Sequence, residues 1–345
     1  MTDQPPRVGV SLACMDPQDI LSLAQEAEQS GLYFVSVPDY AEDTFSVLAA
    51  IAATTSRIRL VSGLATWTRT PVTTARACRS LHLLSDGRYI LGLGSMPRQW
   101  SEDFHGISAD APLSRLREYV ELIRILWEAT PDDPVDFSGR FYSVSGYRVP
   151  QEPVGQHLPV FIGATRRRMI RESGEWADGL LLNWNVTVPW LEEQVMPALA
   201  EGAARAGRSL DGFETVTLTP VLIADGLGET EAARTAIRLH LAMAYLGIDY
   251  HQDMLTRMGF GEEVAAAAAR LASGDLDGAA RAVSDPMLEA LAIVGDEGEC
   301  RRRVSEYTSL GSWFTLFPPV LGMKASDRVR TLRRLIQAFG DGGRG

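Results

Sequence analysis

The chain has 345 residues, of which 46% are hydrophobic and 22% are charged, close to the average for a folded globular protein. These proportions exclude disordered, collagen-like and disulfide-scaffold proteins, and no apolar run approaches the roughly 18 residues of a membrane helix. The 33 basic and 44 acidic residues give a net charge of −11, which repels phosphate backbones and anionic lipid. We therefore expect no nucleic-acid partner and no membrane partner.

The cysteines and the first residues bear on location. Cys14, Cys78 and Cys300 are widely spaced and form no CxxC pair, and the opening MTDQPPR has no apolar signal-peptide core. Both observations predict a cytoplasmic protein. The five histidines are scattered singly, whereas metal ligands normally cluster, so we expect no metal site.

Eight short apolar segments alternate along the chain with longer segments of helical spacing. The predicted strands are residues 8–12, 34–38, 58–63, 89–94, 159–163, 179–183, 215–223 and 313–318. The predicted helices are residues 17–30, 46–55, 71–85, 113–129, 166–176, 190–206, 229–246 and 297–310. This alternation is typical of a parallel sheet covered by helices, either an open doubly wound sheet or a closed (β/α)8 barrel. The count of eight strands favours the barrel.

Two long insertions interrupt the alternation. Residues 99–152 hold a predicted long helix and the segment FSGRFYSV, and residues 247–291 are rich in alanine and predicted to be helical. We therefore predict a single α/β domain over residues 1–345, a (β/α)8 TIM barrel with helical insertions.

In such a barrel the catalytic groups come from the carboxyl ends of the strands. The second predicted strand ends in VPDY, which places Asp39 and Tyr40 at this edge, although Asp39 could instead cap a helix or pair with an arginine. The third strand runs into SGLATWTRTP and offers Ser62, Gly63, Thr66, Trp67 and Arg69. Glycine inside a strand, as at Gly63, often marks a bulge or the close approach of a ligand.

The segment FIGATRRR, residues 161–168, is a candidate anion site. A predicted strand runs through Gly163, Ala164 and Thr165 into a helix that opens with three arginines. Free amides at a helix N-terminus bind anions, and a phosphate would offset the unfavourable placement of three cations there. The alternative is that these arginines are merely solvated. GLGS at residues 92–95 lacks the third glycine of a dinucleotide-binding loop, and no helix is predicted directly after it, so we interpret it as a tight turn.

Six segments, in this order along the chain, carry a resemblance to a known family. They are VSVPDY, the block at residues 56–95 (SRIRLVSGLATWTRTP through GRYILGLGS), LREYVELIRILWE, FSGRFYSV, LPVFIGATRRRMIRESGEWADGLLLN and IVGDEGECRRRVSEYTSLG. Together they resemble the luciferase-like flavin and deazaflavin oxidoreductases over nearly the whole chain.

The resemblance implies a (β/α)8 barrel with an isoalloxazine-type ring in the strand mouth and a phosphate tail against the loops after the fourth and fifth strands. In deazaflavin-dependent members the third strand bulges under the ring through a non-proline cis peptide, which here matches the Gly63–Leu64 bond. The implied cofactor-binding residues are Asp39, Ser62, Gly63, Leu64, Thr66, Ser95, Gly163, Ala164, Thr165 and Arg166.

The family divides between FMN monooxygenases and enzymes of the deazaflavin coenzyme F420, and the late segment from YLGIDYHQDM to ALAIVG is similar to the F420 branch. The chain departs from the sugar-phosphate dehydrogenase members, since Tyr40 stands where they carry histidine and Pro97 where they carry glutamate. We therefore expect a reductase that transfers hydride to an activated double bond or imine, with Tyr40 as proton donor and Asp39 as second choice. The alternatives are an FMN monooxygenase with a partner reductase and a catalytically silent cofactor-binding protein.

The tryptophans indicate a hydrophobic substrate pocket, although core packing explains any one of them. We assign Trp67, Arg98 and Trp184 to this pocket, with Trp100 and Trp190 as further aromatic candidates. The expected partners are a small-molecule or modified-peptide substrate and a second copy of the chain in a homodimer.

Overall fold

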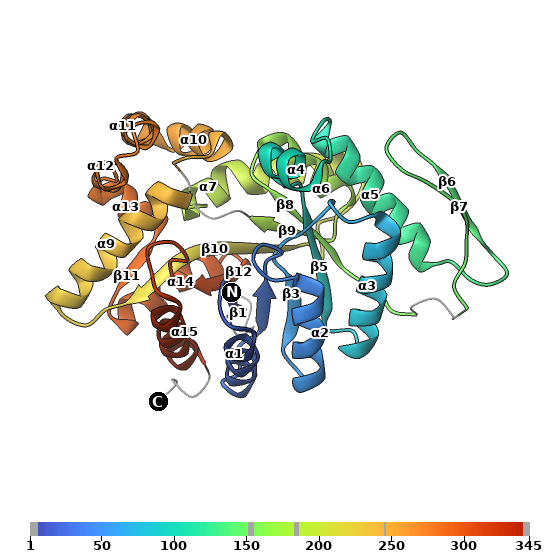
Figure 1. Cartoon of the computed structure of the whole chain (residues 1–345), viewed down its shortest axis with the longest axis horizontal. Helices are drawn as coiled ribbons and strands as arrows, with labels where there is room; N and C mark the ends of the chain where they lie inside the picture. Colours follow the sequence, from blue (N-terminus) through green and yellow to red (C-terminus); the bar gives the residue numbers. More distant parts are fainter. Residues whose placement is uncertain (1–5, 151–154, 183–185, 245, 341–345) are drawn as a thin grey trace.

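Eight parallel strands close into a ring, around which the helices are arranged (Figure 1). The computed structural model describes residues 6–150, 155–182, 186–244 and 246–340. The barrel strands are β1 (Val8–Ser11), β2 (Phe34–Val37), β3 (Arg59–Ser62), β5 (Tyr89–Gly94), β8 (Val160–Ala164), β9 (Gly179–Leu182), β10 (Glu214–Ile223) and β12 (Trp313–Phe317). Pairing of β12 with β1, in which Val8 faces Phe314, closes the ring. The predicted barrel is confirmed, and the open sheet is excluded.

Short pieces of strand were missed. β4 (Ala65–Thr66) pairs with β5, and β11 (Ile293–Gly295) pairs with β10 outside the ring. Both are too short for an alternation of apolar and polar residues to reveal them. The predicted interruption after the third strand is confirmed, because the chain leaves the sheet at Gly63 and Leu64, whose peptide bond is cis, and returns as β4.

The helices that cover the barrel follow the predicted segments to within a few residues. They are α1 (Pro17–Gln29), α2 (Thr44–Thr54), α3 (Pro71–Leu84), α5 (Pro112–Trp127), α6 (Arg167–Trp176), α7 (Val188–Trp190), η1 (Leu191–Val195), α8 (Met196–Arg205), α9 (Leu227–Ala244) and α14 (Glu297–Thr308). A further helix, α15 (Ala325–Phe339), was not predicted. Side-chain caps set several starts: the Asp43 carboxylate accepts from the Ser46 amide, so α2 begins two residues earlier than expected. No helix of the described residues has both the length and the apolar composition that a membrane span requires.

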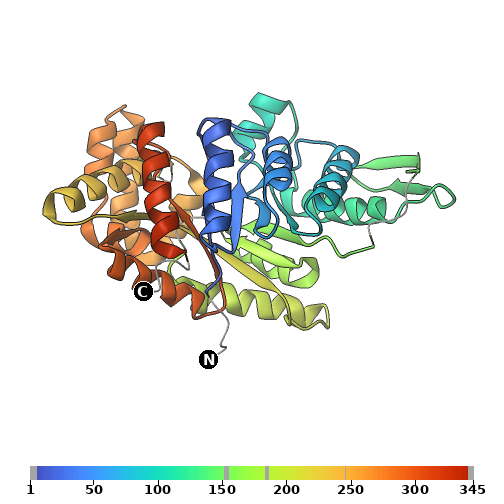
Figure 2. The ribbon, with the colours of Figure 1, turned by 90° about the horizontal axis from the view of Figure 1, so that it is seen from below.

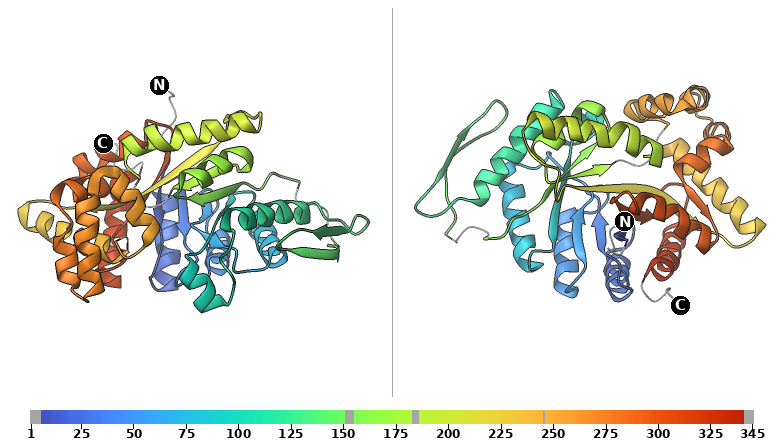
Figure 3. Two further views of the ribbon diagram at one scale, coloured as in Figure 1. Left: turned by 90° about the horizontal axis from the view of Figure 1, so that it is seen from above. Right: turned by 180° about the vertical axis from the view of Figure 1, so that it is seen from behind.

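The two insertions lie at opposite ends of the molecule (Figures 2 and 3). The first holds α4 (Arg98–His105), α5 and a hairpin of β6 (Val135–Ser138) with β7 (Ser143–Tyr147), which includes the FSGRFYSV segment. The second is helical, as predicted, with α10 (Asp249–Leu255), η2 (Thr256–Phe260), α11 (Gly261–Ala272), α12 (Leu276–Arg281) and α13 (Asp285–Leu291). Its helices pack on α9 around a hydrophobic cluster of their own.

The GLGS segment is not the tight turn that we expected. Gly92 and Gly94 lie within β5, and α4 begins only at Arg98, three residues after Ser95. A Cβ atom on Gly92 would stand 1.9 Å from the Ser62 carbonyl oxygen of β3. The glycine is therefore required by the close approach of two neighbouring strands rather than by a turn or a phosphate.

Two buried histidines, His240 in α9 and His251 in α10, make the stability of the fold depend on pH. Burial lowers the pKa of His240 to about 4 and that of His251 to about 3, while a histidine in the unfolded chain titrates near 6.5. Protonation is therefore linked to unfolding, and the free energy of unfolding should fall as the pH drops below about 6.5. We expect each histidine to lower the free energy of unfolding by on the order of 2 kcal/mol at pH 5 relative to pH 7, as measured by urea unfolding at the two pH values.

Substitution identifies the source of this pH dependence. His240→Gln should flatten the slope of unfolding free energy against pH, whatever it does to stability at pH 7. His105→Gln is the comparison variant, because His105 is exposed in the last turn of α4 and its replacement removes no buried imidazole. Equal slopes for wild type and His240→Gln would contradict the assignment.

Candidate active site at the strand mouth

The mouth is built around Leu64, between the carboxyl ends of β3, β5 and β8. A Cβ atom on Gly94 would meet the Leu64 side chain at 2.6 Å, and one on Gly163 would meet it at 2.5 Å. The Leu64 side chain therefore lies against the bare backbone of two strand ends that are far apart in sequence. Three of the predicted positions, Gly63, Leu64 and Gly163, are thus brought together, and Gly94 joins them.

Asp39 is held in place by three interactions beside Leu64. Its amide donates to the Leu64 carbonyl at 3.0 Å, and its carboxylate accepts from the Thr44 amide at 3.3 Å and pairs with Arg69 at 3.3 Å. Arg69 also pairs with Asp43 at 2.7 Å. Burial disfavours the Arg69 cation, but the hydrogen bond to Asp43 and the field of Asp39 outweigh it and raise its pKa. The arginine pair expected as an alternative for Asp39 is thus present, whereas the cap of α2 is Asp43 and Asp39 accepts only from the first amide of that helix.

Tyr40 extends outward from the same loop. Its side chain is 62% exposed and lies next to Trp100 of α4, with 5.5 Å between ring centroids. The phenol is therefore accessible at the mouth, whereas the neighbouring Asp39 carboxylate is occupied.

The candidate anion site lies where β8 gives way to α6. Gly163 and Ala164 end the strand, Thr165 follows it, and no side chain caps the helix. Two of the three arginines are committed elsewhere: Arg167 pairs with Glu201 at 2.8 Å and Arg168 with Glu172 at 3.0 Å. The expectation of a three-arginine cluster facing an anion is therefore wrong, and Arg166 is the one that has no ion pair with a described residue.

The remaining predicted residues divide into surface and interior. The Ser62 hydroxyl lies 2.6 Å from the Tyr89 hydroxyl in a buried pair, so the Ser62 side chain is not available to a ligand. Trp67 is 2% exposed and belongs to the core, which corrects its assignment to an open substrate pocket. Thr66 is also nearly buried, and its hydroxyl lies 2.8 Å from that of Thr68.

The other predicted residues are not buried in the core. Arg98 is on the surface of α4, and Ser95 follows the end of β5. Trp184 lies outside the described residues.

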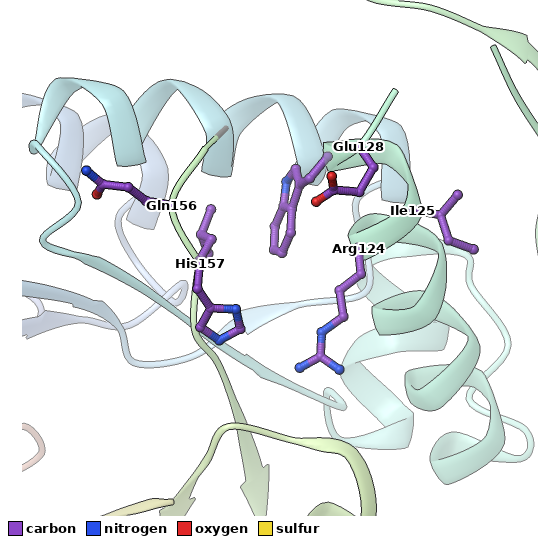
Figure 4. Close-up of a pocket in the computed structure, with 7 residues that line it drawn as sticks. Arg124, Ile125, Glu128, Gln156 and His157 are labelled. Carbon is purple, nitrogen blue, oxygen red and sulfur yellow. The ribbon is translucent and has the colours of Figure 1, made fainter. Parts of the chain in front are cut away.

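Two cavities elsewhere do not coincide with this mouth. One, of about 360 Å³, lies at the amino end of β8 beside α5 and is lined by Arg124, Glu128, Gln156 and His157 among others (Figure 4). The other, of about 490 Å³, lies between Trp190 and the second insertion. The amino end of a barrel strand is opposite the end where barrel enzymes place their chemistry, so we base the active site on the strand mouth and not on cavity size. No three potential metal ligands gather anywhere in the described chain.

Sequence reasoning missed two residues that brace the mouth loops. The Glu42 carboxylate accepts from the amides of Cys14 and Met15, both at 3.2 Å, and so joins the loops after β2 and β1. Arg328 of α15 is nearly buried and donates to the carbonyls of Cys14 and Met323. Neither residue has a local signal, because its partners lie in other loops.

The fold and this mouth define an α/β-barrel protein whose functional groups come from the carboxyl ends of parallel strands. A family described as luciferase-like monooxygenase matches residues 1–312, and the chain belongs to that family. It is 29% identical to the 5,10-methylenetetrahydromethanopterin reductase of Archaeoglobus fulgidus, over 83% of this chain and 84% of that protein. It is 32% identical to the F420-dependent glucose-6-phosphate dehydrogenase of Nocardia farcinica, over 57% and 62%.

A solved structure supports the fold independently. The coenzyme F420-dependent tetrahydromethanopterin reductase of Methanopyrus kandleri superposes with a TM-score of 0.76 at 23% identity, covering 96% of this chain and 98% of that one. This likeness extends to the whole barrel and its insertions.

Proposed function

We propose that this protein is a coenzyme F420-dependent oxidoreductase, and that it acts as a reductase toward an activated double bond or imine. The glycine-lined mouth beside Leu64 is the observation that carries the proposal. Such a surface suits the flat ring that the family resemblance implies in the strand mouth, and the relatives named for F420 favour that cofactor over FMN.

The residues present fit such a cofactor. At Gly94 and Gly163 a Cβ atom would collide with Leu64, so the two glycines make room for the Leu64 side chain, whose apolar surface a flat ring could lie against. The uncapped start of α6 offers amide groups to an anionic tail, and Arg166 adds a cation beside it. Gly163, Ala164, Thr165 and Arg166 would hold the tail, and Leu64 would support the ring.

When bound and reduced, F420 supplies a hydride, so the protein must supply a proton and position the substrate. Tyr40 is the proton donor that we propose, because its hydroxyl is accessible at the mouth. Asp39 orients the Tyr40 loop through Leu64, Thr44 and Arg69. Tyr40 and Pro97 stand where the sugar-phosphate dehydrogenase members carry histidine and glutamate, so the acid–base pair that those enzymes use to oxidise a sugar alcohol is missing. This argues against sugar-phosphate oxidation and leaves a reductase that needs only a proton donor.

The cofactor assignment is tested by fluorescence titration with F420 and with FMN. We expect F420 to bind more tightly, and equal or reversed affinities would overturn the assignment in favour of an FMN monooxygenase. Arg166→Ala should weaken F420 binding about 3- to 10-fold at low salt, and added salt should reduce the difference because the contact is ionic.

Arg168→Ala is the matched control for this experiment. Arg168 lies two residues away, is 73% exposed and pairs with Glu172, so its removal should leave F420 affinity within about twofold of wild type. An equal loss in both variants would mean that general charge, and not the Arg166 contact, attracts the cofactor. The expected substrate, a small molecule or modified peptide, the homodimer and the cytoplasmic location remain predictions.

A further inference from the structure

A row of three aromatic side chains leads outward from the mouth. Tyr40 and Trp100 have ring centroids 5.5 Å apart and planes inclined by 32°, and Trp100 and Phe104 are stacked at 6.2 Å and 20°. Trp100 and Phe104 stand four residues apart on α4, so they share one face of that helix. We call these three residues the aromatic row.

The aromatic row is unusually open to solvent. Among the described residues, the exposed large apolar side chains include two aromatic ones, Tyr40 at 62% and Phe104 at 71%, and both belong to the row. Trp100, between them, is partly buried. Neighbouring rings of this kind are typical of a binding face, because aromatic rings contribute much contact area and little conformational freedom. The row is continuous with the active site, since Tyr40 directly follows the residue that donates to the Leu64 carbonyl.

The charges around the row restrict what it binds. Arg98, at the start of α4, pairs with Glu102 at 2.6 Å and with Asp110 at 3.1 Å, so its charge is neutralised. Asp103 is also exposed on this helix, which leaves the surroundings of the row negative. An anionic group would be repelled there, whereas a neutral flat molecule would stack on the rings.

We propose that the aromatic row is the wall on which the substrate lies, and that the substrate is a flat, conjugated molecule with no negative charge at this end. The proposal rests on the proposed function, because it takes Leu64 as the support of the cofactor ring. It places Tyr40 at the inner end of the row, beside the reacting bond, and Phe104 at the outer end.

A pair of matched probes tests this proposal on the F420-loaded protein. N-phenyl-1-naphthylamine is neutral, and 8-anilinonaphthalene-1-sulfonate has the same aromatic frame with one negative charge. We expect the neutral probe to bind more tightly, and the Trp100→Ala/Phe104→Ala double variant to bind it about 10-fold more weakly than wild type. The single variant Trp100→Phe should retain most of the wild-type affinity for the neutral probe, because it keeps a ring at that position.

The control is Leu227→Ala, which removes an 88% exposed apolar side chain at the start of α9 and should leave probe affinity unchanged. The proposal would be overturned if the double variant bound the neutral probe as tightly as wild type does, or if wild type bound the anionic probe more tightly than the neutral one. A change from dimer to monomer in sedimentation of the double variant would also overturn it, since the row would then be a subunit interface. If wild type does not bind F420 at all, that separate result would reject the proposed function without testing the binding of the probes to the aromatic row.

Discussion

Replacing Gly92 by alanine should destabilise the barrel by about 3 kcal/mol or more. The added Cβ would lie 1.9 Å from the Ser62 carbonyl oxygen, which is backbone of the neighbouring strand, and 2.4 Å from the Leu181 side chain. The leucine tip can rotate away, but the carbonyl cannot move without separating β3 from β5. We expect a clearly lowered thermal midpoint in far-UV circular dichroism, or little folded protein on expression.

The comparison for this variant is Gly228→Ala in α9. No atom lies within 4 Å of a Cβ at Gly228, and its backbone is helical, so alanine there should be neutral or slightly stabilising. If the two variants melt at the same temperature, close contact between β3 and β5 does not limit stability. Such a result would also mean that the barrel wall adjusts more easily than a packed interior normally does.

Replacing Tyr40 by phenylalanine should lower turnover about 100-fold or more while F420 affinity changes little. The substitution keeps the ring that stacks beside Trp100 and removes only the hydroxyl, so the loop and the aromatic row should persist. The measurement is the oxidation of reduced F420 by a substrate found in a screen of activated alkenes and imines, together with an F420 titration.

Tyr147→Phe in β7 serves as the control, because the β6–β7 hairpin lies at the edge of the molecule away from the barrel strands (Figure 1) and this variant also loses only a hydroxyl. Unchanged turnover in Tyr40→Phe would move proton donation to a water molecule or to Asp39. Asp39 would then have to act despite its contacts with Arg69 and Thr44. Absence of turnover by wild type with every substrate tried would favour the silent cofactor-binding protein.

Much of the architecture was readable from local patterns. Apolar segments alternating with helical segments predicted eight strands, and all eight form the ring. The position of Asp39 and Tyr40 at a strand end followed from the same alternation, because the mouth of a barrel is the end where each strand stops. A glycine inside the third strand indicated the interruption at Gly63. These features depend on spacing within about 20 residues, which sequence periodicity records directly.

The roles of individual mouth side chains were decided by which loops meet after the ring closes. The Asp39 carboxylate pairs with Arg69, 30 residues away in the sequence, and Arg167 pairs with Glu201, 34 residues away. Trp67 was expected to face a substrate but is enclosed in the core, whereas Trp100 is partly buried and packs beside the exposed Tyr40. Such partnerships are non-local, so no spacing in the chain encodes them. The sequence by itself determined the barrel and the residues that stand at the carboxyl ends of its strands, and only the packing of separate loops decided which of their side chains remain available to a ligand.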